Sequence, residues 1–350
     1  MARLFAREAG RDLSMRIPSI RSKKFFLALA CAILVLLVLL SAAAVLLNKP
    51  PRTDQTLGVT FSTMYARQLG LDPKETYSAI LGDLGVRAVR LPVYWDEIER
   101  EKDVYDWELL DWMIDQSQQN DAQVTLVIGQ KVPRWPECFI PDWAEKMSFA
   151  HAEVELIEFM EQVVVRYRES PAIIRWQIEN EALFPFGVCP PPDPGRLERE
   201  VELVRSLDTR PIQLTVSGEI EPYVDAAALA DILGISMYRV TWNKYFGYMY
   251  YPITPGFYRA KAAVAEPLVD KIIITELQTE PWFHEPIEQS PLSEWYELFD
   301  EKDLKRNVDF ARRTGFDEVY AWGVEWWYFL KQNGEPRLWE TARELFDDML

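Results

Sequence analysis

The stretch "AIIRWQIENEALF", residues 172–184, joins an apolar run to a group of polar side chains. Its first half is β-rich and apolar, which is typical of a parallel strand buried on both faces. Its second half places Glu179, Asn180 and Glu181 where that strand should end. Because carboxylates are seldom fully buried unless they are paired, this strand end indicates a functional site as well as a core element.

Seven further β-rich runs surround this one along the chain. They are residues 56–62, 86–93, 122–129, 211–218, 231–238, 271–277 and 316–324. Segments with helical patterns lie between most of them, at 72–85, 106–120, 152–168, 194–207, 221–229, 301–315 and 335–350. Eight strands alternating with helices predict a (β/α)8 TIM barrel. A doubly wound open sheet is the alternative, but it usually needs fewer strands, and no G-x-G-x-x-G follows the first run.

The N-terminal part has a different composition. Residues 1–24 carry seven Arg and Lys, and residues 25–47 are apolar with Ser41 as the one clearly polar side chain. About 20 apolar residues span a bilayer as a helix, so 25–47 is predicted to be a transmembrane anchor. The basic tail places the N-terminus in the cytoplasm, and the domain 56–350, after a linker at 48–55, outside it at the cell membrane. A cleavable signal peptide is the alternative, although its apolar region is usually shorter.

The overall composition narrows the possible partners. Apolar residues make up 49% of the chain, and the formal net charge of -17 argues against nucleic-acid binding. No H-E-x-x-H, Cys/His cluster or P-loop is present, so we expect no metal and no cofactor. We expect a monomer.

Two carboxylates occupy equivalent places on two predicted strands. Glu181 ends the fourth strand and Glu276 ends the seventh, within "IIITEL". Catalytic groups of such barrels lie at the C-terminal ends of the strands, so both should face one pocket. A carboxyl pair is what cleavage of a glycosidic bond requires, because one group protonates the leaving oxygen and the other attacks carbon or activates water.

The motifs "IENE" and "ITEL" make the chain resemble the retaining glycoside hydrolases of clan A, which include cellulases of family 5. The resemblance covers roughly residues 55–350. It implies that Glu181 is the general acid/base, that Glu276 is the nucleophile, and that Asn180 holds the sugar 2-hydroxyl.

Three further positions match the same family. "VRLP" places Arg90 where the clan often has an Arg beside the nucleophile, and "ISMY" places Tyr238 where a Tyr hydrogen-bonds it. "YAWG" places Trp322 where a Trp often floors the sugar subsite. For Arg90 the alternative is an ordinary ion pair that braces the barrel.

The chain contains thirteen Trp, and several follow predicted strands. They are Trp95, Trp135, Trp143, Trp242, Trp282, Trp326 and Trp327. Aromatic rings can stack on the apolar faces of sugars, so we expect Trp95, Trp135 and Trp282 to bind substrate, with loop packing as the alternative. Glu219 and Glu325 should also lie near the mouth, where they contact sugar hydroxyls or remain as solvated acids.

Cys138 and Cys189 follow the third and fourth predicted strands, whose loops are neighbours in a barrel. Outside the cytoplasm they can form a disulfide that braces the cleft wall beside Glu181, or they can remain as free thiols.

These features predict a retaining glycosidase that cleaves β-linkages of an extracytoplasmic glycan by double displacement. Two alternatives remain open. One is a barrel that binds carbohydrate without turnover, and the other is a transglycosylase that uses the same Glu pair.

Overall fold

The computed structural model describes residues 29–31, 33–35 and 51–347. Residues 29–31 and 33–35 are helical, and the rest of the predicted anchor, 25–47, lies outside the described residues, as do the basic tail and residues 48–50. Among the described residues, no helix has both the length and the apolar character needed to cross a membrane.

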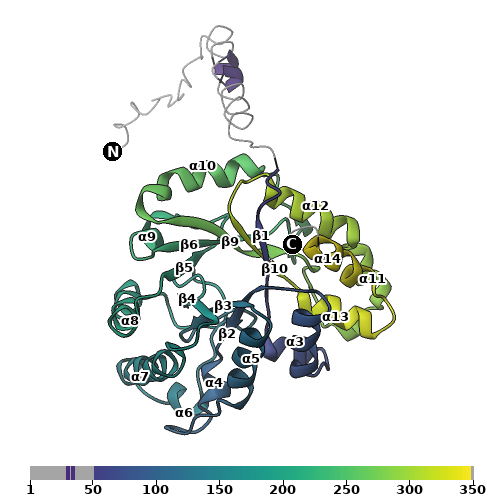
Figure 1. Cartoon of the computed structure of the whole chain (residues 1–350). Coiled ribbons are helices and arrows are strands. Elements are labelled where there is room, and N and C mark those ends of the chain that lie inside the picture. Colours follow the sequence, from purple (N-terminus) through teal and green to yellow (C-terminus); the bar gives the residue numbers. More distant parts are fainter. Residues whose placement is uncertain (1–28, 32, 36–50, 348–350) are drawn as a thin grey trace, which may run out of the picture. The chain divides into compact units, whose positions relative to one another are not determined.

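The domain that follows is a closed barrel of eight parallel strands, which confirms the predicted (β/α)8 fold (Figure 1). The strands are β1 (Thr56–Thr60), β2 (Ala88–Pro92), β3 (Gln123–Ile128), β4 (Ile173–Ile178), β5 (Ile212–Val216), β6 (Ile232–Met237), β9 (Lys271–Gln278) and β10 (Glu318–Trp322). Each corresponds to one of the predicted runs. The ring closes where β1 pairs with both β2 and β10. An open doubly wound sheet is therefore excluded.

Helices surround the barrel (Figure 1). They are α2 (Thr63–Gln68), α3 (Pro73–Gly82), α4 (Trp95–Ile98), α5 (Glu108–Gln119), α6 (Asp142–Glu145), α7 (Phe149–Tyr167), α8 (Pro194–Leu207), α9 (Val224–Ala227), α10 (Pro255–Ala265), η1 (Glu266–Leu268), η2 (Ile287–Gln289), α11 (Leu292–Leu298), α12 (Glu301–Arg312), α13 (Val324–Gln332) and α14 (Arg337–Asp347). Asp72, Asp193 and Asp300 cap α3, α8 and α12 by accepting backbone N–H groups of the first turn. All predicted helices are present. The sequence patterns did not predict α10 and α13, or the shorter helices α2, α4, α6, α11, η1 and η2.

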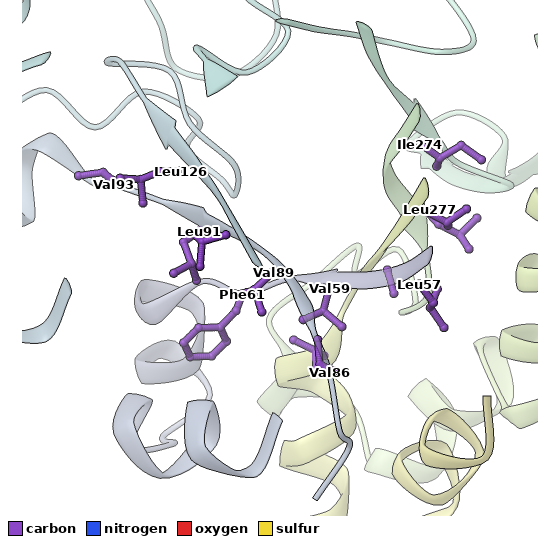
Figure 2. Packing of buried hydrophobic residues seen from close by; sticks show 14 of the residues in the cluster. Leu57, Val59, Phe61, Val86, Val89, Leu91, Val93, Leu126, Ile274 and Leu277 are labelled. Atoms are coloured by element: carbon purple, nitrogen blue, oxygen red, sulfur yellow. The ribbon is translucent and has the colours of Figure 1, made fainter. Parts of the chain in front are cut away.

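The main core packs the outward faces of the strands against these helices. Figure 2 shows part of it, where Val59 of β1, Val89 of β2, Leu126 of β3 and Ile274 of β9 are fully buried. Burial of an aliphatic side chain of this size stabilises a fold by roughly 1.5–3 kcal/mol. The β-branched and leucine-rich runs that predicted the strands thus supply the layer that holds the barrel closed.

The chain enters the barrel at the N-terminal ends of the strands. The backbone N–H of Arg52 donates to the carbonyl of Arg312 at 3.1 Å, and that of Thr56 donates to the carbonyl of Asp317 at 2.9 Å. This is the end of the barrel opposite to the C-terminal strand ends that carry the predicted site.

Candidate active site

The end of β9 carries a bulge that directs Glu276. Ile235 of β6 pairs with Ile274, but the next residue, Ser236, pairs with Glu276, so Thr275 is an extra residue in β9. The pairing with β10 shifts over the same stretch. Bulges bend a strand and change where its side chains point, and they are frequent beside active sites. The inserted residue brings Glu276 to the inside of the barrel end.

Arg90 of β2 connects the Glu276 carboxylate to β4 and to the turn that follows β4. Its Nη1 donates to Oε1 of Glu276 at 3.0 Å, its Nη2 to Oδ1 of Asn180 at 2.6 Å, and its Nε to Oε1 of Gln177 at 2.7 Å. Arg90 is fully buried and Glu276 is 4% exposed. Because the guanidinium fixes both groups at once, it positions the Asn and the Glu relative to each other.

Tyr238 contacts the second oxygen of Glu276. Its hydroxyl donates to Oε2 at 3.2 Å, and its backbone N–H is held by Oε1 of Glu219 at 2.8 Å. The ring of Trp282 meets the ring of Tyr238 edge-on at 5.7 Å. Both oxygens of Glu276 therefore accept hydrogen bonds, which fix the orientation of its carboxylate.

The end of β4 has an unusual backbone. Glu179 and Glu181 both have positive φ, at 54° and 47°, in a region that residues other than Gly enter at an energetic cost. Hydrogen bonds hold this turn. The Glu179 carboxylate accepts from the backbone N–H groups of Gln130 and Lys131 at 3.1 and 2.5 Å. Glu179 thus braces β4 against the loop after β3.

Glu181 emerges from this turn beside other carboxylates. Its backbone N–H donates to the hydroxyl of Thr215 on β5 at 2.8 Å. Burial of its carboxyl group, followed by repulsion from Glu276, Glu221 and Glu137, raises the pKa of Glu181 well above its ordinary value. A carboxyl group that keeps its proton near neutral pH can act as a general acid.

Glu137 is a site residue that the sequence did not reveal. It lies in the loop after β3, is 8% exposed, and accepts a long hydrogen bond of 3.4 Å from Nδ2 of Asn180. Burial and the charge of Glu276 raise the pKa of Glu137 to about 8. In the sequence, Glu137 is part of "WPEC" in an irregular loop. No apolar periodicity in this loop predicts where its side chain lies.

A cavity of about 480 Å³ lies next to these groups. Its lining includes Glu137 and Tyr238, together with the aromatic side chains of Trp135, Trp282 and Trp322. Trp135 is 60% exposed and meets Phe186 edge-on at 6.1 Å. The volume is within the usual range for a small-molecule site. Its open aromatic wall suits the apolar face of a sugar ring.

Arg134 occupies one side of this cavity. Its guanidinium centre lies 3.9 Å from the ring centre of Tyr65 and 4.2 Å from that of Trp322. The same group forms ion pairs with Glu280 and Glu325. Arg134 therefore packs on the Trp322 ring that the resemblance assigned to the sugar.

Two residues expected to contact substrate are buried in the structure instead. Glu325 is fully buried in α13, where Oε1 accepts from the backbone N–H of Ser62 at 2.5 Å and Oε2 from Arg134 at 2.8 Å. Trp95 is also fully buried, because it begins the short helix α4 soon after β2 and its ring stacks on Phe159 of α7 at 5.7 Å. Trp326 and Trp327 belong to α13 and are buried as well.

Cys138 and Cys189 form a disulfide with a Cα–Cα distance of 5.3 Å. The bond connects the loop after β3 to the loop after β4, and Cys138 directly follows Glu137. Among the described residues, no group of three or more His, Cys, Asp or Glu side chains has the arrangement of a metal site.

Solved structures share this architecture. A β-galactosidase from the Antarctic haloarchaeon Halorubrum lacusprofundi superposes with a TM-score of 0.54 at 16% identity over 83% of this chain and 57% of its own. A cold-adapted β-galactosidase from Rahnella sp. R3 gives 0.58 at 12% identity, over 86% and 57%. The chain thus spans little more than half the length of these two enzymes.

Xylanase 10B from Thermotoga petrophila, solved with xylobiose, is similar over more of its own length. It superposes with a TM-score of 0.54 at 14% identity, over 84% of this chain and 94% of the xylanase. No protein-family model and no curated protein sequence matches the chain. At these identities the likeness establishes the barrel fold that such glycosidases have.

Proposed function

We propose that this protein is a retaining glycoside hydrolase that cleaves β-glycosidic bonds. The observation that carries the proposal is the pair Glu181 and Glu276, which lie at the end of β4 and in β9 and have different surroundings. Glu276 accepts hydrogen bonds from Arg90 and Tyr238, which position it as the nucleophile. The raised pKa of Glu181 favours a proton donor.

The reaction takes two displacements at the anomeric carbon. First, Glu276 attacks this carbon while Glu181 protonates the departing glycosidic oxygen, which leaves a glycosyl ester on Glu276. Then Glu181, now a carboxylate, removes a proton from water as the water oxygen attacks the same carbon and releases Glu276. Two inversions give net retention. The fold that the chain shares with β-galactosidases and a xylanase is compatible with this chemistry.

The test uses the full-length protein and a panel of aryl β-glycosides and β-linked oligosaccharides. We expect turnover of at least one substrate, and a loss of about a thousandfold or more in Glu276→Gln. With azide present, Glu276→Gly should yield an α-glycosyl azide, because azide then replaces the missing nucleophile. Glu181→Ala should yield the β-anomer, because azide then attacks the ester.

Other results would support the alternatives. Products longer than the substrate would indicate a transglycosylase. Binding of glycan by both the wild type and Glu276→Gln, without turnover by either, would indicate a carbohydrate-binding barrel and contradict the proposal.

We also propose that residues 25–47 anchor the protein in the cell membrane with the domain outside the cytoplasm. The apolar length of this segment, the basic residues before it, and the disulfide all support this location. Treatment of intact cells with a protease that cannot cross the membrane should then digest a C-terminal tag. Protection of the tag until the cells are lysed would refute the topology.

A further inference from the structure

Glu137 lines the cavity and has one carboxyl oxygen without a hydrogen bond. Its Oε2 accepts the 3.4 Å hydrogen bond from Asn180, whereas its Oε1 accepts no hydrogen bond from any described residue. The residue is more than nine-tenths buried and lines the cavity. Burying a carboxyl group without partners is costly, so this placement requires an explanation that the two-carboxylate reaction does not supply.

Neighbouring cations do not hydrogen-bond with Glu137. The donors of Arg90 go to Glu276, Asn180 and Gln177. The Nζ of Lys131 donates to the backbone carbonyls of Glu181 and Phe184 at 2.9 and 2.7 Å. Near neutral pH the Glu137 carboxyl group keeps its proton, because its pKa is raised to about 8, and no basic side chain among the described residues is directed at it. A ligand that brings a basic amine can take this proton and form an ion pair with the carboxylate that remains.

We propose that Glu137 is a specificity-determining residue that binds the ammonium group of a 2-amino-2-deoxy sugar held at Glu276. This inference rests on the proposed glycosidase function and names its substrate class. In double displacement the anomeric carbon lies at Glu276, so the substituent on the adjacent carbon lies beside the nucleophile. The Oε2 of Glu137 accepts from Asn180, whose Oδ1 accepts from the same Arg90 that pairs with Glu276, so the Glu137 carboxyl group lies on this side of the sugar.

An ammonium group fits this position better than other substituents. It donates up to three hydrogen bonds, including a charge-assisted one to Oε1 of Glu137. A neutral amine can also take the proton that Glu137 holds near neutral pH, which gives the same ion pair. An N-acetyl group brings no charge, and the carboxylate of a uronic acid would be repelled.

The experiment compares matched aryl β-glycosides that differ at C2, in both the gluco and the galacto series. The full-length wild type should hydrolyse a 2-amino-2-deoxy substrate with a kcat/KM about 10- to 100-fold above that of the 2-hydroxy substrate. Glu137→Gln keeps the size of the side chain but removes its charge, and it should reduce this ratio to about one. Glu137→Asp should restore part of the preference.

Glu99→Gln is the matched control. Glu99 is a buried carboxyl outside the site, bonded to Nε1 of Trp95 at 2.8 Å, so its loss should leave the substrate ratio unchanged. Thermal unfolding of each variant shows that the proteins remain folded. The inference would be overturned by a wild type that prefers the 2-hydroxy or N-acetyl substrate. It would also be overturned by a Glu137→Gln variant that keeps the wild-type preference for the 2-amino substrate. In both cases the glycosidase function stands.

If no glycoside is turned over, binding measurements distinguish the amino-sugar site from the glycosidase function. D-glucosamine, D-galactosamine and D-glucose are then titrated into the wild type and Glu137→Gln by calorimetry. Tighter binding of an amino sugar that is lost in Glu137→Gln would retain the amino-sugar site and reject hydrolysis. Equal affinity for the amino and hydroxyl sugars would overturn the amino-sugar site as well.

Discussion

The Nη1 of Arg90 lies 3.0 Å from Oε1 of Glu276, and both side chains are buried inside the barrel end. The two residues come from β2 and β9 and are separated by 186 positions in the sequence. Arg90 is thus at once a structural partner and part of the site, so the two interpretations of this ion pair are compatible.

Replacing Arg90 by Met should impair both folding and catalysis. Removal of one partner leaves Glu276 buried without a counter-ion, which should cost about 3–5 kcal/mol in the free energy of unfolding. Urea denaturation measures this loss. Arg166→Met is the control, because Arg166 forms an exposed ion pair with Asp111 that should contribute less than about 1 kcal/mol. Similar losses in both variants would contradict the role given to Arg90.

Tyr238→Phe should slow the reaction without unfolding the protein. It removes the hydroxyl that donates to Glu276 at 3.2 Å and keeps the ring against Trp282. A hydrogen bond to a charged acceptor contributes about 1.5–3 kcal/mol, so kcat/KM should fall by roughly 10- to 100-fold. Steady-state kinetics on one aryl glycoside measures the change. An unaltered rate would show that this contact does not act in the transition state.

Breaking the disulfide should loosen the site as well as the fold. Cys138 and Cys189 are separated by 51 positions, and closing a loop of this size typically stabilises a protein by about 2–4 kcal/mol. Cys138→Ser with Cys189→Ser should lower the urea midpoint by the corresponding amount. It should also reduce kcat/KM, because Glu137 adjoins Cys138. Adding a reductant to the wild type should reproduce both effects, and adding it to the double variant should change nothing.

Stability should fall as pH rises above about 5, partly because of Glu137. The folded state keeps this proton up to about pH 8, whereas the unfolded chain releases it near the ordinary value of 4.5. Between these values the folded state binds more protons than the unfolded state, so the free energy of unfolding decreases with pH. One group contributes at most about 1.4 kcal/mol per pH unit. Glu137→Gln should flatten the profile over this window, and parallel curves for the two proteins would contradict the assignment.

Trp135→Ala should affect long substrates selectively. The ring is 60% exposed at the edge of the cavity, where it can stack on a sugar some distance from the bond that breaks. Loss of one aromatic contact should raise KM for an oligosaccharide about 3- to 10-fold and leave an aryl monosaccharide glycoside nearly unchanged. Equal effects on both substrates would instead indicate a general disturbance of the loop.

The sequence predicted the barrel because every strand is a short apolar run between amphipathic helices. Strand order then determined which residues could meet, and Arg90, Asn180, Tyr238 and Glu276 are indeed joined by hydrogen bonds. Their catalytic roles stay predictions. The spacing of apolar residues made these predictions possible, because a strand or a helix buries side chains at regular intervals along its length.

Loops between the strands were predicted less well. The sequence predicts Trp95 in an open loop after a strand, but a single helical turn buries its ring against α7. Glu137 was not predicted to be a site residue. Its loop contains two residues with positive φ, Arg134 and Glu137, and such an irregular loop has no repeating sequence pattern. The bulge at Thr275 was likewise invisible, since an inserted residue changes the register without changing the apolar run.

The hydrogen bonds of Arg52 and Thr56 join the start of the domain to the end of the barrel that lies away from the cavity. We therefore expect that a solid support attached before Arg52 leaves the substrate entrance unobstructed. A chain coupled to beads through its N-terminus should accept polymers as readily as the free protein, whereas coupling through the loops beside Trp135 should exclude them.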